Sequence, residues 1–73
     1  MVTFHFSMAL SAAKCKQFYS GQVQYVVVTD DYGKTIQLPI SRFRPFMTTN
    51  GLRGRFRLLL DNNHKFVALE KIG

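Results

Sequence analysis

Carboxylates, histidines and cysteines are scarce in this sequence. Its 73 residues include four acidic side chains, two histidines and one cysteine. Three of the acids lie in predicted turns and the fourth in a predicted strand, so no pair of carboxylates is expected to flank a catalytic cleft. One cysteine and two histidines fall short of a closed tetrahedral zinc site, and no phosphate-cradling glycine loop is present. We therefore predict a protein that is not an enzyme, with no catalytic residue, no metal site and no cofactor.

Long apolar runs and cysteine pairs are also missing. No stretch approaches the ~18 apolar residues that a membrane span needs. The lone Cys15 allows no intramolecular disulfide, which fits a reducing compartment. Residues 2–10 alternate apolar with polar side chains, whereas the core of a signal peptide is continuously apolar. We predict a cytoplasmic protein, folded as one domain over residues 1–73.

The first part of the chain predicts a strand followed by a short helix. Five apolar residues alternate strictly in the strand: Val2, Phe4, Phe6, Met8 and Leu10. Ser11 is a suitable N-cap for the helix, and Gly21 suits the position just beyond its end. The helical stripe expected to face the core consists of Ala12, Cys15, Phe18 and Tyr19.

Two hairpins are predicted from the remaining apolar patterns. Residues 22–29 pair with 34–40 around a turn at 30–33, and residues 52–60 pair with 65–72 around a turn at 61–64. In the first, Thr29 opposite Lys34 places six apolar residues on the inner face: Val23, Tyr25, Val27, Ile36, Leu38 and Ile40. In the second, Leu60 opposite Lys65 sets Leu58 against Val67, Phe56 against Leu69 and Arg55 against Glu70, with Phe66 on the outer face.

The segment between the hairpins breaks the strand pattern. Arg44 precedes a proline and is pushed out of the helical region, so at most one short turn is expected over residues 41–46. Phe43 and Phe46 are expected to close one end of the core. A second turn is predicted at residues 48–51, where Asn50 precedes Gly51.

The element order is therefore β-α-β-β-turn-β-β, which predicts an α+β fold with a mainly antiparallel five-stranded sheet. Five strands and one helix could bend into a small, partly closed barrel of the SH3-like sort, which would remove exposed strand edges. A bent open sheet with the helix across one face is the alternative.

Arginine is concentrated in one part of the chain, and the net charge is +6. All five arginines lie in an acid-free stretch between Arg42 and Arg57. Arg53, Arg55 and Arg57 alternate with apolar residues and glycine, so a strand would display them on its water-facing side. Residues two apart on a strand are separated by about 6.6–6.8 Å, close to the spacing of successive phosphates along a nucleic-acid strand.

This pattern supports three interpretations, because arginine suits phosphate and carboxylate equally well. We expect a non-enzymatic binding module that engages a polyanion, RNA or single-stranded DNA, without a membrane partner. The alternatives are a protein-interaction or homo-oligomeric module that binds an acidic protein, and a solvated face without a ligand. The predicted nucleic-acid- or anion-binding residues are Arg42, Arg44, Arg53, Arg55 and Arg57.

The chain also resembles a family of short bacterial proteins known as domain of unknown function 2835. The segments that carry the resemblance are Phe18-Tyr19-Ser20-Gly21, Gln37-Leu38-Pro39, Arg44-Pro45-Phe46, residues 51–58 and residues 65–70. The resemblance spans nearly the whole chain and implies no catalytic residue. Ala13 and Lys14 stand where members tend to have acids, which weakens the favourable charge at the helix N-terminus.

Overall fold

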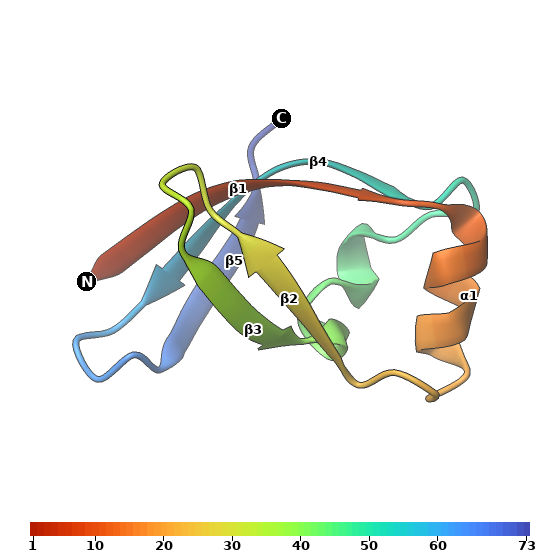
Figure 1. The fold of residues 1–73 in the computed structure, drawn as a ribbon, viewed down its shortest axis with the longest axis horizontal. Coiled ribbons are helices and arrows are strands. Elements are labelled where there is room, and N and C mark those ends of the chain that lie inside the picture. Colours follow the sequence, from red (N-terminus) through yellow and green to blue (C-terminus); the bar gives the residue numbers. More distant parts are fainter.

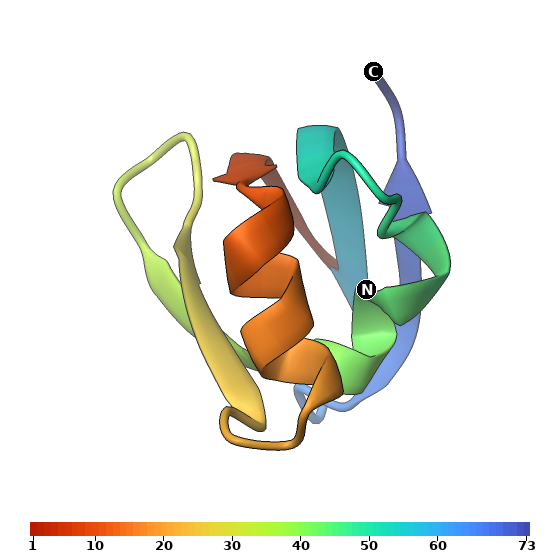
Figure 2. The ribbon, with the colours of Figure 1, turned by 90° about the vertical axis from the view of Figure 1, so that its right-hand side faces the viewer.

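In the computed structural model, which describes residues 1–73, five strands form two antiparallel sheets (Figure 1). The larger sheet has the order β1-β4-β5, with β1 (Val2–Leu10), β4 (Leu52–Leu60) and β5 (Phe66–Lys71). The smaller sheet pairs β2 (Tyr25–Thr29) with β3 (Thr35–Pro39). The helix α1 (Ala12–Tyr19) lies at one end of the molecule, in front of the space between the two sheets in Figure 2. Two 3-10 helices, η1 (Ile40–Arg42) and η2 (Arg44–Phe46), appear beside it in that view, in front of β5.

The predicted α+β class and the antiparallel pairing are therefore confirmed. The strands bend into two sheets and do not close into a barrel. One main-chain hydrogen bond, from the N–H of Asp31 to the carbonyl of His5 (2.9 Å), joins the β2–β3 turn to β1. None of the helices is long and apolar enough to cross a membrane.

Aromatic rings form the centre of the core between the sheets. Phe6, Phe43 and Phe56 are fully buried. The rings of Phe6 and Phe56 stack at 5.8 Å between centroids, and Phe43 meets both edge-on, at 6.2 and 5.7 Å. Edge-to-face and offset-stacked pairs of this kind add to the stability that burial provides. The expectation that Phe43 closes the core is confirmed, while Phe46 is only half-buried at its rim.

The helix begins as predicted but presents a narrower buried face. The hydroxyl of Ser11 accepts a hydrogen bond from the N–H of Lys14 (3.2 Å), and Gly21 follows the helix with a φ of 81°. Cys15 and Phe18 are buried. Tyr19 is exposed, so its predicted place in the core is wrong: the helix ends there, beyond the sheets, and the guanidinium of Arg44 lies over its ring.

The turn between β2 and β3 is one residue shorter than predicted. The N–H of Asp30 donates to the carbonyl of Lys34 (2.8 Å), which leaves a loop of residues 31–33 ending at Gly33 with a φ of 83°. The carboxylate of Asp30 accepts the N–H groups of Tyr32 (3.0 Å) and Lys34 (2.7 Å). A type I turn followed by a left-handed residue is a common three-residue hairpin loop.

This turn shifts the first hairpin by one residue and reverses the faces of β2. Val28 pairs with Ile36 and Val26 with Leu38, and these four side chains point into the molecule. Val27 is 62% exposed and Tyr25 is 54% exposed. The predicted inner positions of Tyr25 and Val27 are therefore wrong, because a one-residue slip moves every side chain of a strand to the other face.

The β4–β5 turn repeats the same design with different residues. The carboxylate of Asp61 accepts the N–H groups of Asn63 (2.8 Å) and Lys65 (2.9 Å), and His64 takes the left-handed position with a φ of 63°. The N–H of Asp61 donates to the carbonyl of Lys65 (2.9 Å). The predicted pairing of Leu60 with Lys65 is therefore wrong.

A β-bulge then shifts the second hairpin further. Leu60 pairs with Phe66 but Leu59 pairs with Ala68, so Val67 is the extra residue. Beyond the bulge, Leu58 pairs with Leu69, and the predicted pairs of Leu58 with Val67 and of Phe56 with Leu69 are wrong. Phe66 packs against the core instead of the predicted outer face.

Two 3-10 turns, not one, connect β3 to β4. Pro45 lies in the first turn of η2, where its missing N–H costs no hydrogen bond. The predicted turn at residues 48–51 is confirmed by the bond from the N–H of Thr48 to the carbonyl of Gly51 (2.9 Å). Gly51 has a φ of 108°, and a Cβ there would collide with the carbonyl of Leu10. This close approach lets β4 begin directly beside the end of β1.

Candidate functional site

The arginine row lies on the outer face of β4, the central strand of the larger sheet. Leu52, Phe56 and Leu58 alternate with the arginines and are buried. On β1, the residues opposite the arginines are His5, Ser7 and Ala9. The alternation in the sequence thus predicts the face of these side chains correctly.

Arg55, however, is held by a carboxylate of the same chain. Its guanidinium donates two hydrogen bonds to Asp31, at 2.8 and 2.6 Å, and a third to the hydroxyl of Ser7 (3.1 Å). The bond from Arg55 lowers the pKa of Asp31, and the same contact raises the pKa of Arg55. A bidentate contact of this kind fixes both side chains, so Arg55 ties the β2–β3 turn to the larger sheet.

Arg57 is paired as well. Its Nη2 lies 2.9 Å from Oε2 of Glu70, the residue opposite it on β5. The predicted contact of Glu70 with Arg55 is wrong, because the shorter loop and the bulge move β5 by two residues. All three arginines of the row lie on the water-facing side of the strand as expected, but Arg55 and Arg57 are engaged there by carboxylates of the same chain.

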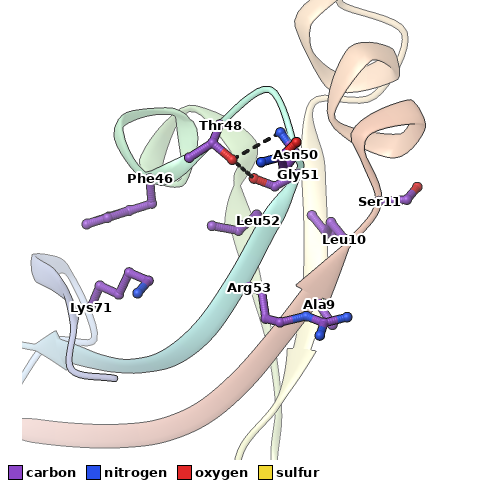
Figure 3. Close-up of a pocket in the computed structure, with 10 residues that line it drawn as sticks. All are labelled: Ala9, Leu10, Ser11, Phe46, Thr48, Asn50, Gly51, Leu52, Arg53 and Lys71. Carbon is purple, nitrogen blue, oxygen red and sulfur yellow. Dashed lines mark hydrogen bonds between the residues drawn. The ribbon is translucent and has the colours of Figure 1, made fainter.

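Arg53 has no carboxylate partner and lies beside a groove (Figure 3). The groove has a volume of about 570 Å³ and lies around the first residues of β4. Its lining includes Phe46, Thr48, Asn50 and Lys71, and Lys71 also has no carboxylate partner. The groove is thus lined by two free cations, a half-buried aromatic ring and polar side chains. Arg53 extends toward Ala9, on the other side of β4 from Phe46 and Lys71 (Figure 3).

Gly54 makes room for Lys71 at this groove. A Cβ at position 54 would lie 2.7 Å from Cε of Lys71 and 2.5 Å from the carbonyl oxygen of Gly73. A glycine inside a strand often marks such a close approach. Sequence reasoning did not include Lys71 or Phe46 in the site, and Gly54 was the one signal that could have pointed to Lys71.

The other two predicted arginines lie on the 3-10 helices, away from the row. The guanidinium carbon of Arg42 lies 3.9 Å from the centre of the Phe66 ring. That of Arg44 lies 6.0 Å from the centre of the Tyr19 ring. A cation over an aromatic ring keeps its charge, so both remain available to an anion. The structure therefore does not bring the five predicted residues together in one row.

All four carboxylates are engaged within the chain. Asp30 and Asp61 accept main-chain N–H groups in the two hairpin turns, and Asp31 and Glu70 hold arginines. These two ion pairs engage two of the ten lysines and arginines, so eight have no carboxylate partner. Three of the acids lie in the hairpin turns, at the end of the molecule opposite α1 (Figure 1).

The remaining reactive side chains are scattered. Cys15 is buried on the inner face of α1, His5 lies on the outer face of β1 and His64 in the β4–β5 turn. No group of three or more histidine, cysteine or acidic side chains is close enough to hold a metal ion.

These features define a class: a small basic α+β module with an aromatic core between two antiparallel sheets and arginines along its central strand. The chain belongs to the family described as "Protein of unknown function (DUF2835)", whose model matches residues 2–72. The resemblance noted from the sequence is thereby confirmed. No curated protein and no solved structure matches the chain significantly.

Proposed function

We propose that this protein is a non-enzymatic cytoplasmic module that binds a polyanion, with RNA or single-stranded DNA as its ligand. The observation that carries the proposal is the groove at the start of β4. Arg53 and Lys71 line it without carboxylate partners, while every acid of the chain is engaged in a turn or an ion pair. A polyanion approaching this groove meets positive charge with no free side-chain carboxylate to repel it.

The groove also offers contacts that a single strand can use. Phe46 contributes an aromatic surface, and unpaired bases stack on such surfaces. The side-chain amide of Asn50 provides donors and an acceptor beside it, while the hydroxyl of Thr48 already donates to the carbonyl of Gly51 and accepts the N–H of Asn50. Arg53 and Lys71 supply the charges that position phosphates.

Four cations carry the binding in this proposal: Arg42, Arg44, Arg53 and Lys71. Arg55 and Arg57 are already neutralised by carboxylates and hold the fold instead. Four phosphate contacts on a single strand would make log affinity fall with log salt with a slope of about −2.8. The affinity should be measured by fluorescence anisotropy with a labelled oligothymidylate and oligouridylate over a range of salt concentrations.

A pair of double variants separates the groove from bulk charge. Arg53→Gln combined with Lys71→Gln should reduce the steepness of the salt dependence by about 1.4, the contribution of two contacts. Lys34→Gln combined with Lys65→Gln removes the same charge near the hairpin turns and should leave the slope almost unchanged. Equal effects of the two double variants would refute the groove as the site. Absence of oligonucleotide binding even at low salt would refute the function, and an acidic protein would become the candidate partner.

A further inference from the structure

Strand β3 leaves one of its edges without a partner. It pairs with β2 alone. Main-chain bonds beyond both ends of this pairing show which residues face β2: Asp30 donates to the carbonyl of Lys34, and Ile40 donates to that of Gln24 (both 2.8 Å). Because main-chain groups alternate direction along a strand, even-numbered residues of β3 point to β2 and odd-numbered residues point away.

Thr35 and Gln37 therefore present free N–H and C=O groups at this edge. Pro39 presents only a carbonyl, so the ladder of donors ends at Gln37. The edge can therefore pair with one short added strand of about four residues. Extended peptides bind to sheet edges in this way, by adding a strand through main-chain hydrogen bonds.

A partly apolar groove lies beside this edge. It has a volume of about 430 Å³ and is lined by Lys34 and β3 (Thr35–Pro39) together with Phe4, Leu60, His64 and Phe66. We call it the β3 groove. Side chains of an added strand alternate between two faces, so every second residue would face these apolar side chains.

The border of the β3 groove is positively charged. The ammonium of Lys34 lies 5.6 Å from the centre of the Phe4 ring, and Arg42 covers one face of Phe66. Neither cation has a carboxylate partner. A ligand that carries acids between its apolar residues would complement this border. A second copy of this chain would not, because each copy carries a net charge of +6.

We propose that the β3 groove binds an extended peptide segment of alternating acidic and apolar residues, which adds to β3 as a further antiparallel or parallel strand. Its main chain bonds with Thr35 and Gln37, its apolar side chains contact Ile36 and Phe66, and its acids lie near Lys34. This site is distinct from the groove at the start of β4, and Arg42 at its border is the one cation that also belongs to the proposed nucleic-acid contacts. Peptide binding at the β3 groove does not depend on nucleic-acid binding.

The test uses an acetylated, amidated hexapeptide of alternating valine and glutamate as the probe, with the valine–lysine hexapeptide as its control. Amide hydrogen exchange, followed by NMR at saturating probe, should slow at Thr35 and Gln37. It should stay unchanged at Val27, whose N–H points to the opposite edge of the same sheet by the same alternation. The valine–lysine hexapeptide should slow amide exchange at neither Thr35 nor Gln37.

Two pairs of variants test the main-chain and charge contacts separately. Gln37→Pro removes the free N–H but no bond to β2, and should weaken binding of the glutamate probe at least about fivefold relative to Gln37→Ala. Lys34→Glu should weaken it, whereas Lys14→Glu, the same change on α1, should not. The lysine variants also test the proposal if the proline variant fails to fold.

Four results would overturn the proposal. The first is that amide hydrogen exchange at Thr35 and Gln37 does not change when the glutamate probe is bound. The second is that both hexapeptides bind with equal affinity. The third is that raising the protein concentration alone, without a probe, slows exchange at the free edge of β3. The fourth is slowed exchange produced by oligothymidylate, which would make the β3 groove part of a nucleic-acid site.

Discussion

Replacing Phe56 by alanine should remove a large part of the stability of the fold. Phe56 is fully buried and contacts three other rings, Phe6, Phe43 and Phe46, at centroid distances of 5.8, 5.7 and 5.4 Å. Deleting a buried phenyl ring costs about 3–5 kcal/mol. A chain of 73 residues has a total free energy of unfolding of about 4–11 kcal/mol. The variant should therefore be marginally folded or unfolded at room temperature.

The expected change in melting temperature follows from the chain length. An unfolding entropy of about 2.1 cal/mol/K per residue gives ~0.15 kcal/mol/K for the whole chain, so a loss of 3–5 kcal/mol lowers Tm by about 20–30 °C. Thermal unfolding followed by far-UV circular dichroism measures this shift, and urea unfolding gives the free energy independently.

Two further variants control for the chemistry of the change. Phe56→Leu keeps most of the volume and should cost less than the alanine variant. Tyr32→Ala removes an aromatic ring that is 95% exposed at a turn and should change stability by less than about 0.5 kcal/mol. A Phe56→Ala protein that melts at the wild-type temperature would contradict the aromatic core described above.

Acid titration and thiol labelling test two other contacts. The folded-state pKa of Asp31 lies below its unfolded value, so its contact with Arg55 stabilises the fold above about pH 4 and is lost as pH falls through the lowered pKa. An NMR titration should show the pKa of Asp31 rising in the Arg55→Gln variant, and an unchanged pKa would disprove the contact. Cys15 is buried on the inner face of α1, so a thiol reagent should label it slowly in the native protein and quickly in denaturant. Rapid native labelling would mean that this face of α1 is not packed against the core.

The long strands could be predicted almost to the residue, while the turns could not. The bounds of β1 and β4 agree with the prediction. Large apolar side chains alternate strictly in both strands, so only one face of each strand can be buried against the core. The hairpin registers depended instead on one aspartate in each turn, Asp30 and Asp61. Each is followed three residues later by the left-handed residue and four residues later by a lysine, a repeated pattern that could have revealed the shorter loops.

The candidate site was predictable only as far as it depends on a single strand. Alternation along β4 places the arginine row on the outer face, but pairing of Arg55 with Asp31 joins residues 24 positions apart through the folded hairpin. Lys71 likewise reaches the groove only because β5 crosses beside Gly54. Contacts of this kind depend on how two elements pack, which local sequence patterns do not contain.

The complete engagement of the acids also has an evolutionary consequence. Substituting any of the four carboxylates removes a turn bond or an ion pair, so such a change alters the fold together with the charge. Most lysines, by contrast, are exposed and unpaired, and gaining or losing one leaves the main-chain framework intact. Lineages carrying this fold could therefore adjust the strength of their positive field by substituting lysines alone, while the positions of negative charge stay fixed by folding.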